Sequence, residues 1–499
     1  MTSLTLADVI EGLTGKRIEA SQIVSDIVID SRQATPGSVF VALPGQHTDG
    51  HQFVNEALRK GAVAAIVRQA VAPADQLQTI VAGQASPDQL TAAVKDLPIC
   101  IQTEDTLSGL QQLASFWRSK FEPRVTGVTG SVGKSTTKEL IWAVLSSRYN
   151  CLKNEGNYNN EIGLPLTLLK LNPSYEQVVL EMGMYTLGEI ALLCEIARPQ
   201  VGVVTNVEPV HLEQLGTMER IAQAKSELVE ALPTGASVEA EPHQGGVAIL
   251  NYDDPLVRAM ARATTARVFT YGLSAEADLW ADEVTSAGLE GVRFVFHYRG
   301  ESVHARVPLL GRHSVHTALR AALVGLVAGL DWADIISGLQ SLPKSAQLRL
   351  VAVAGPNGST LLDDTYNANP ASTIAALNLL DDLAATKKIA VLGDMMELGS
   401  FEEEGHRKVG CRAADIVDQL IVVGVRAKWI AEEARACGLN PASILELDDN
   451  QAAIDQLRQT LEPSNVVLIK GSNSQHMGVI VSALTMSDGS SSSRKDRRS

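Results

Sequence analysis

The chain has 499 residues, of which 45% are hydrophobic, 20% charged and only 4% aromatic, and its net charge is −15. This length suits about three globular domains. The acidic balance argues against a non-specific nucleic-acid binder, so we expect no nucleic-acid partner.

The sequence favours a cytoplasmic protein. The longest apolar run, residues 321–330, is shorter than the roughly 20 residues that a membrane helix needs. The N-terminus lacks the basic n-region of a secretory signal. The cysteines are scattered, odd in number and without a C-x-x-C pair, which predicts buried thiols and neither a disulfide framework nor a zinc site. They are Cys100, Cys151, Cys194, Cys411 and Cys437.

Residues 1–104 alternate short strand and helix signals and predict a first α/β domain. The strand-like SVFVAL (38–43) precedes the helix-like FVNEALRKGA (53–62) and the strand-like VAAIV (63–67). A stretch rich in Pro, Gln and Ala over residues 70–90 predicts a loop or an insertion.

Residues 105–343 predict a second α/β domain. The strand RVTGV (124–128) runs into a glycine-rich loop, and buried-type strands follow at 177–183 and 201–206. Apolar runs separated by helical patterns are typical of βαβ units and a mainly parallel sheet. The helix after the loop has an apolar face formed by Leu140, Ile141, Val144 and Leu145.

Residues 344–486 predict a third, Rossmann-like α/β domain. Its strand candidates are TLLDDT (360–365), KIAVLGD (388–394), QLIVVG (419–424) and VVLIKGS (466–472). Residues 487–499 are Ser-rich and basic, which predicts a disordered tail.

Residues 127–137, GVTGSVGKSTT, predict a phosphate-binding loop of unusual spacing. In the common pattern G-x-x-x-x-G-K-[ST] the first glycine would stand at Val128. Backbone N–H groups at a helix N-terminus favour phosphate. Lys134 would reach the terminal phosphates, and the Ser135 hydroxyl would contact magnesium. The strand before the loop and the helix after it favour a nucleotide site over a turn whose glycines serve packing.

Three further residues are candidates for metal binding or catalysis. Glu181 ends an apolar run, and α/β sheets place their ligands at the carboxyl ends of strands. His211 lies in the loop after the next strand, and Lys225 lies in a helical stretch. Their spacing alone does not distinguish them from a core histidine and a solvated lysine.

The loop TGSVGKS (129–135) resembles the ATP loop T-G-[ST]-x-G-K-[ST] of the Mur ligases, the ATP-dependent amide ligases of peptidoglycan precursor synthesis. The resemblance extends to about residue 485 and is strongest to the members that join D-alanyl-D-alanine to UDP-N-acetylmuramoyl-tripeptide. The N-terminal DSR (30–32) resembles the family's UDP-sugar-binding domain. The stretches that point to these members are NYNNEIGLPLTLL (157–169), EMGMYTLGEI (181–190), HLEQLG (211–216), DDTYNANPAS (363–372) and VLGDMMELG (391–399).

The resemblance implies ATP, Mg²⁺ and a carbamylated lysine at Lys225, with Lys134, His211 and Lys225 as catalytic residues. The implied ATP-binding residues are Thr129, Gly130, Ser131, Val132, Gly133, Lys134, Ser135, Thr136, Thr317 and Arg349. The implied metal ligands are Ser135, Glu181, His211 and carbamylated Lys225. The implied substrate residues are Ser31, Asn159, Asn160, Asp364, Tyr366, Asn367 and Asn369.

The chain departs from the family pattern at two places. In GRHSVHTALRA (311–321), Ser314 and Thr317 stand where the family has Asn, and the second of these Asn residues contacts adenine. In KGSN (470–473), Asn473 replaces an Arg, which removes a positive fork that could hold a carboxylate.

The implied reaction is amide formation by a cytoplasmic monomer through an acyl phosphate. The alternatives are a diamino-acid-adding Mur ligase, a folylpolyglutamate-type synthetase, a P-loop switch and an inactive scaffold. The UDP-sugar-type block argues against the folate enzyme, and YNANP (366–370) against the diamino-acid ligase. The sequence has no N-K-x-D motif, which argues against a guanine-nucleotide switch. The intact set of candidate catalytic and metal-binding residues argues against an inactive scaffold.

Overall fold

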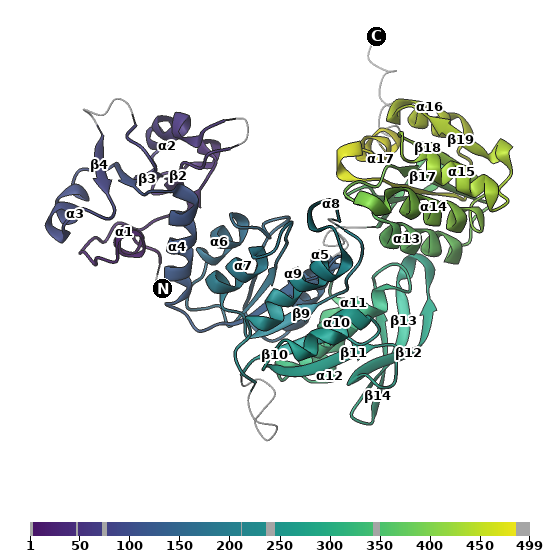
Figure 1. The fold of residues 1–499 in the computed structure, drawn as a ribbon, viewed down its shortest axis with the longest axis horizontal. Coiled ribbons are helices and arrows are strands. Elements are labelled where there is room, and N and C mark those ends of the chain that lie inside the picture. The colour runs from purple at the N-terminus through teal and green to yellow at the C-terminus, as the bar shows by residue number, and fades with distance from the viewer. Residues whose placement is uncertain are drawn as a thin grey trace, which may run out of the picture.

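The computed structural model of the chain contains three α/β domains, which confirms the predicted fold class. Figure 1 shows the N-terminal domain in purple and blue, the central domain in teal and the C-terminal domain in green and yellow, with the central domain between the other two. The boundaries after residues 104, 343 and 486 stay predictions, and the tail at 487–499 lies outside the described residues. The described residues are 3–45, 48–71, 77–210, 212–235, 245–342 and 350–485.

The N-terminal sheet is parallel, with the strand order β1-β2-β3-β5-β4. Its elements are α1 (Leu6–Thr14), β1 (Ile27–Val28), β2 (Val39–Val41), α2 (Val54–Arg59), β3 (Ala64–Val67), β4 (Gln78–Val81), α3 (Pro87–Ala93) and β5 (Ile99–Gln102). β4 and α3 correct the expectation of a loop over residues 70–90. Pro87 stands in the first turn of α3, where its missing N–H does no harm, and the Ser86 side chain caps the helix.

Helix α4 (Thr106–Arg118) joins the N-terminal domain to the central domain. It packs against α1 on one side and against α6 (Gly163–Leu168) and α7 (Glu189–Ala197) on the other. The fully buried Trp117 donates its Nε1–H to the Leu171 carbonyl at 3.0 Å. One continuous apolar core therefore runs from α1 through α4 into the central domain.

The central sheet has the order β14-β13-β12-β11-β10-β9-β6-β8-β7. Its strands are β6 (Arg124–Thr129), β7 (Cys151–Lys153), β8 (Gln177–Glu181), β9 (Val201–Val204), β10 (Val247–Asn251), β11 (Arg267–Gly272), β12 (Leu279–Ser286), β13 (Val292–Tyr298) and β14 (Glu301–Val307). All pairs are parallel except β12 with β13 and β13 with β14. β6 lies where the chain crosses from one half of the sheet to the other, the place where open α/β sheets bind ligands.

Helices cover both faces of the central sheet. α5 (Lys134–Leu145), α11 (Ser314–Val327) and α12 (Trp332–Gln340) cover one face, and α4, α6, α7 and α9 (Met218–Glu230) cover the other. Strand β8 therefore has apolar residues on both sides, which explains why it reads as a continuous hydrophobic run. None of the described helices combines the length and the apolar character needed to cross a membrane.

The C-terminal sheet has the order β15-β16-β20-β17-β18-β19, and only β15 pairs antiparallel. Its strands are β15 (Val351–Ala354), β16 (Thr360–Asp364), β17 (Lys387–Gly393), β18 (Gln419–Val423), β19 (Ile444–Leu447) and β20 (Asn465–Lys470). Helices α13 (Pro370–Asp382), α14 (Glu402–Ala414) and α15 (Lys428–Ala436) cover one face, and α16 (Asn450–Thr460) and α17 (Gly478–Thr485) cover the other.

Cys411 and Cys437 form a disulfide, so the expectation that all five cysteines carry free thiols is wrong for this pair. Helices α14 and α15 pack together. The Cα atoms of the two cysteines therefore lie 5.4 Å apart, although 26 positions separate them in the sequence. Cys100, Cys151 and Cys194 are free. Burial raises the pKa of the Cys100 and Cys194 thiols to about 12, so both stay protonated at neutral pH.

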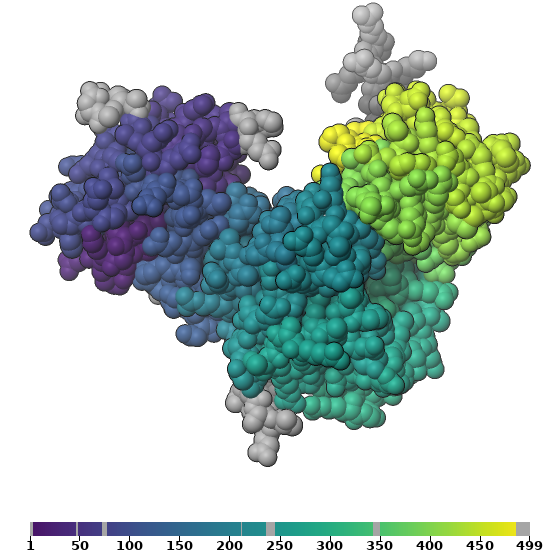
Figure 2. Space-filling model, in the orientation of Figure 1, coloured from purple at the N-terminus to yellow at the C-terminus, as the bar shows by residue number. Residues whose placement is uncertain are grey.

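The C-terminal domain rests on the central domain through η7 (Gly399–Phe401). This turn packs against the short helix α8 (Leu212–Leu215), and Phe401 packs against the central core. Figure 2 shows the N-terminal and C-terminal domains standing apart, each in contact with the central domain. The η7 contact and the Arg312–Asp382 ion pair at 3.2 Å both hold the C-terminal domain against the central domain.

Two arginines close to β6 differ in hydrogen bonding and give a test of the fold. Arg118 donates to the carbonyls of Ala197 at 2.9 Å and Phe121 at 2.8 Å, whereas Nε and Nη2 of Arg124 are buried without a partner among the described residues. We expect Arg118→Met to lower the free energy of unfolding by about 2–4 kcal/mol, because it leaves buried carbonyls without donors. Arg124→Met should leave it unchanged or raise it by about 1 kcal/mol. Denaturant unfolding followed by tryptophan fluorescence measures both, and equal losses would contradict the assignment.

Candidate active site

The glycine loop connects β6 to α5 and depends on two glycines. Gly130 has a φ of 143° and Gly133 a φ of 83°, conformations that side chains rarely adopt. A Cβ atom on Gly130 would overlap Thr205 Oγ1. The loop can therefore lie directly against the end of β9. Its backbone leads into the N-terminus of α5, where the partial positive charge of the helix favours phosphate.

Residues that follow β9 hold the loop from the side. The N–H of Ser131 donates to the Asn206 carbonyl at 3.0 Å, and the N–H of Val132 donates to Asn206 Oδ1 at 2.8 Å. Thr205 Oγ1 donates to the Val132 carbonyl at 2.8 Å. These bonds fix the loop in one shape before any ligand binds.

Lys134 is the first residue of α5, and its amine lies over the loop. Nζ donates to the carbonyls of Gly130 at 2.8 Å and Ser131 at 3.2 Å. Ser135 is buried, and Thr136 lines the neighbouring cavity. A cation, hydroxyl groups and backbone donors thus converge at one helix end, which is the donor set that nucleotide phosphates require.

Glu181 ends β8 on the other side of the loop. Thr129 Oγ1 donates to the Met182 carbonyl at 2.9 Å and so ties the end of β6 to the end of β8. Asn159 Nδ2 donates to Glu181 Oε1 at 2.8 Å, whereas Oε2 is buried without a partner among the described residues. A buried carboxylate oxygen without a donor is an acceptor that a cation would satisfy.

Lys225 is buried on α9, with 1% of its surface exposed, so it is not a solvated helix residue. Its burial, together with the nearby cation of Lys134, lowers its pKa well below the usual value. A buried amine with a lowered pKa close to the phosphate loop is chemically suited to modification.

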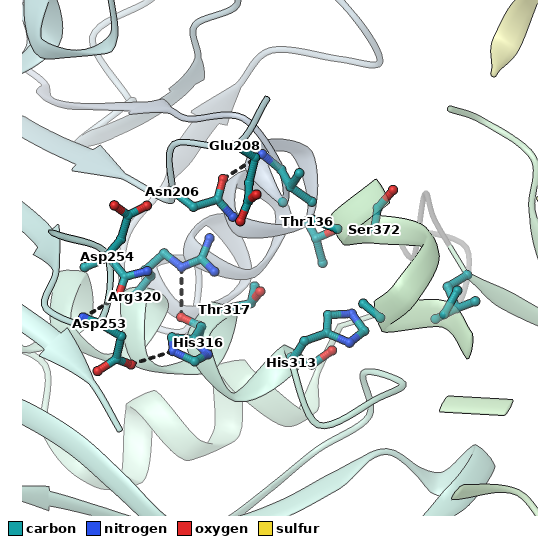
Figure 3. A pocket seen from close by; sticks show the side chains of 18 of the residues that line it. Thr136, Asn206, Glu208, Asp253, Asp254, His313, His316, Thr317, Arg320 and Ser372 are labelled. Carbon is teal, nitrogen blue, oxygen red and sulfur yellow. Dashed lines mark hydrogen bonds and ion pairs between the residues drawn. The ribbon is translucent and has the colours of Figure 1, made fainter. Parts of the chain in front are cut away.

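A cavity of about 620 Å³ opens beside the loop, between the central and the C-terminal domains. This volume lies in the range of ligand pockets. Figure 3 shows Thr136 and Arg320 of the central domain together with Ser372 on a helix of the C-terminal domain. The carboxyl ends of β6, β9 and β10 face those of β16 and β20 across this space.

Asp364 and Lys470 form a buried ion pair in the wall contributed by the C-terminal domain. They are register neighbours at the ends of β16 and β20, with Nζ and Oδ2 2.6 Å apart. Lys470 Nζ also donates to the Asn367 carbonyl at 2.8 Å. Asp364 lines a second cavity of about 480 Å³ as well, which Tyr366 and Asn473 share. Lys470 was not predicted as a site residue from the sequence, although it ends a buried strand, as Glu181 does.

Arg320 is a second site residue that the sequence reasoning missed. It is buried on α11, its Nη1 donates to Thr137 Oγ1 at 2.7 Å, and its Nε donates to the His316 carbonyl at 2.9 Å. His316 Nε2 in turn lies 2.8 Å from Asp253 Oδ2. These bonds tie α11 to the start of α5 beneath the loop. The sequence signal that could have identified Arg320 is its position as the single arginine within the apolar run of α11.

Comparisons with known proteins identify the family. Models of the Mur ligase family catalytic domain, the Mur ligase middle domain and the Mur ligase glutamate ligase domain match residues 24–118, 128–325 and 348–473. A UDP-N-acetylmuramoyl-tripeptide--D-alanyl-D-alanine ligase of Synechocystis is 35% identical over 92% of this chain and 92% of its own length. The chain belongs to the Mur ligase family.

Solved Mur ligases share this architecture. MurF from Acinetobacter baumannii superposes with a TM-score of 0.80 at 26% identity, over 96% of this chain and 98% of that chain. The MurF ligase from Thermotoga maritima in complex with ADP superposes with a TM-score of 0.73 at 27% identity, over 93% and 98% of the two chains. The agreement extends over all three domains.

In this Mur ligase only some of the predicted site residues come together. The loop residues 129–136 lie at one end of the cavity, Thr317 lines its wall, and Asp364 lies in the opposite wall. Ser31 belongs to the N-terminal domain, where its Oγ donates to Glu56 Oε2 at 3.1 Å. The predicted residues that lie outside the described part of the chain are His211 and Arg349.

Three of the predicted substrate asparagines have local structural bonds. Asn160 Oδ1 accepts from the Gly163 N–H at 2.9 Å, Asn367 Oδ1 accepts from the next N–H in the chain, and Asn369 caps α13. Such bonds are the usual role of Asn in turns and caps. Tyr366 is 48% exposed at the rim of the second cavity. The substrate roles of these four residues stay predictions.

The predicted metal site needs more than the described acidic residues. Within the described ranges, no group of three His, Cys, Asp or Glu side chains could hold a metal ion. The unpaired Oε2 of Glu181 and the buried Ser135 fit a Mg²⁺ ligand set. Completing the set requires His211 and a carboxylate-like group, which carbamylation of Lys225 would supply.

Gly130→Ala should disrupt nucleotide binding, because a new Cβ atom would both strain the backbone and overlap Thr205. Gly329→Ala is a matched control, since Gly329 also has a positive φ of 82° but a Cβ there would meet no atom within 4 Å. We expect the control to lose about 1 kcal/mol of stability and to bind ADP normally. Calorimetric titration with ADP compares the two variants, and normal ADP binding by Gly130→Ala would contradict this account of the loop.

Proposed function

We propose that this Mur ligase uses ATP to join D-alanyl-D-alanine to UDP-N-acetylmuramoyl-tripeptide. The proposal is carried by one cavity in which the phosphate loop faces the Asp364–Lys470 pair of another domain. This arrangement suits a reaction that activates one substrate on the central domain and delivers a second from the C-terminal domain. Relatives from Synechocystis, Bacillus subtilis and Escherichia coli carry the name of this ligase, and the Thermotoga relative is in complex with ADP.

In the first step, a carboxylate oxygen of the tripeptide attacks the γ-phosphorus of ATP. The bond to the β-phosphate oxygen breaks, and ADP and an acyl phosphate form. The N–H groups of the loop and the amine of Lys134 stabilise the charge on the phosphates. Since Lys134 now bonds to the loop carbonyls of Gly130 and Ser131, its amine turns toward the nucleotide when the phosphates arrive.

Magnesium would be held by Ser135, Glu181, His211 and carbamylated Lys225. When bound, it neutralises phosphate charge and orients the γ-phosphate. Carbamylation joins the neutral amine of Lys225 to carbon dioxide, forms an N–C bond and releases one proton. The burial of Lys225 and the unpaired oxygen of Glu181 support this ligand set.

In the second step, the amino group of D-alanyl-D-alanine attacks the acyl carbon and phosphate leaves. The proton that the amine loses ends on the departing phosphate, and the acyl phosphate must be kept from water until the amine attacks. Asp364 lines both cavities, so it lies between the nucleotide and the space beside Tyr366 and Asn473. We assign the positioning of the incoming amine to this region of the C-terminal domain.

The N-terminal domain is the candidate binding domain for the UDP-sugar end of the substrate. It stands apart from the C-terminal domain (Figure 2), which leaves room for a long substrate that reaches the phosphate loop from the opposite side. We expect the enzyme to act as a monomer in the cytoplasm, where nucleotide-linked precursors are made.

Phosphate release from purified protein with ATP and Mg²⁺ tests the function. We expect release only when UDP-N-acetylmuramoyl-tripeptide and D-alanyl-D-alanine are both present. Lys134→Met should lower kcat at least about 100-fold, because a transition-state charge loses its cation. Lys170→Met, an exposed lysine of the same domain, is the control. Release with ATP alone would instead indicate an NTPase switch, and release with a UDP-dipeptide and a diamino acid would indicate the other ligase.

Labelling with [¹³C]bicarbonate tests the carbamate. We expect one carbamate resonance in the ¹³C NMR spectrum of the native protein and none in Lys225→Met, a variant that keeps the apolar part of this buried side chain. The readout does not depend on ligase activity. An identical spectrum for the two proteins would refute the carbamate.

A further inference from the structure

The disulfide of the C-terminal domain lies at the protein surface. Cys411 stands in the last turn of α14 and Cys437 at the C-terminal cap of α15, and both residues are exposed. Figure 1 shows these two helices side by side. Cys411 also lines a surface cavity of about 500 Å³. A thiolate in solution can therefore approach the bond, and exposed disulfides are the ones that exchange most readily.

The two helices are held together by contacts other than the disulfide. A Cβ atom on Gly410 would lie 2.4 Å from the Ile430 carbonyl oxygen, so this glycine allows α14 to touch α15. Arg407 donates to the carboxylates of Glu432 at 3.0 Å and Glu433 at 3.2 Å. These contacts do not depend on the bond between the sulfurs. The two cysteines therefore stay close enough to form the bond again after it has opened.

The other three cysteines are poorly suited to thiol exchange. Cys100 and Cys194 are buried, and Cys151 is half-buried. Burial raises the pKa of the Cys151 thiol to about 11, whereas an exposed thiol has a pKa of about 8.5. At neutral pH Cys151 therefore carries roughly 100-fold less thiolate than an exposed cysteine or lower still. Thiol chemistry in the folded protein should concentrate on Cys411 and Cys437.

The disulfide lies at the end of α14 that is remote from the central domain. Helix α14 begins at Glu402, directly after η7, which contacts α8. Glu402 is held by an ion pair with Arg426 in the loop before α15. Cys411 stands nine positions further along α14, about 13 Å at 1.5 Å per residue. Opening the bond should therefore leave the contact with the central domain intact.

The bond should nevertheless contribute to the stability of the C-terminal domain. It closes a loop across 26 positions of sequence that contains the central strand β18. A cross-link of this kind restricts the unfolded chain and so favours the folded state. The folded structure around the active site needs no change for this effect, because the effect acts on the unfolded chain.

We infer that the Cys411–Cys437 bond is a reversible thiol–disulfide exchange site that sets the stability of the C-terminal domain and leaves the active site unchanged. Its reaction partner is a dithiol reductant. One thiolate of the reductant attacks Cys411 Sγ, the bond between the sulfurs breaks, and Cys437 leaves as a thiolate that takes a proton from water. The second thiol of the reductant loses its proton and attacks the mixed disulfide. Cys411 is then released and protonated, and the reductant is oxidised by two electrons.

The inference does not rest on the proposed ligase function. It accounts for a disulfide in a protein that we expect in the cytoplasm, where such bonds are usually transient or redox-sensing. A reducing cytoplasm would keep the bond open, and oxidation would close it.

Maleimide labelling of the folded protein, read by peptide mass spectrometry, tests the exchange. After treatment with oxidised glutathione we expect a cross-linked peptide pair and no label on either cysteine. After dithiothreitol we expect label on both Cys411 and Cys437, at least about 100-fold faster than on Cys151. Glutathione attached to either cysteine in place of the cross-link, or no label after dithiothreitol, would overturn the inference.

Thermal unfolding of the full chain in the two redox states tests the effect on stability. We expect dithiothreitol to lower the unfolding midpoint of the C-terminal domain by about 5–10 °C. The double variant Cys411→Ser/Cys437→Ser should unfold at the midpoint of the reduced protein in both states. Cys151→Ser keeps the disulfide and should retain the response to dithiothreitol. An equal midpoint for the oxidised and reduced native protein would overturn the inference.

The kcat of phosphate release, measured well below the unfolding midpoint, tests the statement about the active site. We expect the same kcat in the oxidised and the reduced protein, and a loss on reduction would overturn that part of the inference. No phosphate release in either state would count against the ligase function and leave the labelling and unfolding results intact.

Discussion

The attachment of the phosphate loop to the end of β9 is the constraint on which the site depends. Gly130 lies so close to Thr205 that no side chain fits, and Asn206 receives hydrogen bonds from two successive loop N–H groups. The loop is therefore preorganised, and the cost of ordering it is met during folding instead of during binding. The positions of Lys134 and Ser135 at the start of α5 follow directly from this attachment.

The cavity arises because two parallel sheets present their carboxyl ends to each other. Strands buried on both faces favour charged groups at their ends, and Glu181, Asp364 and Lys470 all occupy terminal strand positions. The contact of η7 with α8, together with the Arg312–Asp382 ion pair, holds the C-terminal domain against the central domain. A change in this contact would alter the cavity without changing any of its residues.

Much of the fold was predictable because its signals are local. The strands at residues 124–128, 177–183 and 388–394 are short runs rich in apolar residues, and the structure contains β6, β8 and β17 there. The strand and the helix within residues 70–90 were not predictable, because a proline that indicates a break in the chain instead begins helix α3. The relatives favour the D-alanyl-D-alanine ligase over the alternatives that the residues alone left open.

The sequence by itself determined the phosphate loop, the three α/β domains and the family, because each is specified by residues that are adjacent in the chain. Only the tertiary structure decided which distant residues meet. It paired Asp364 with Lys470 and Cys411 with Cys437, and it placed Arg320 beneath the loop. These facts depend on packing between elements far apart in the chain, where sequence spacing carries no information about distance.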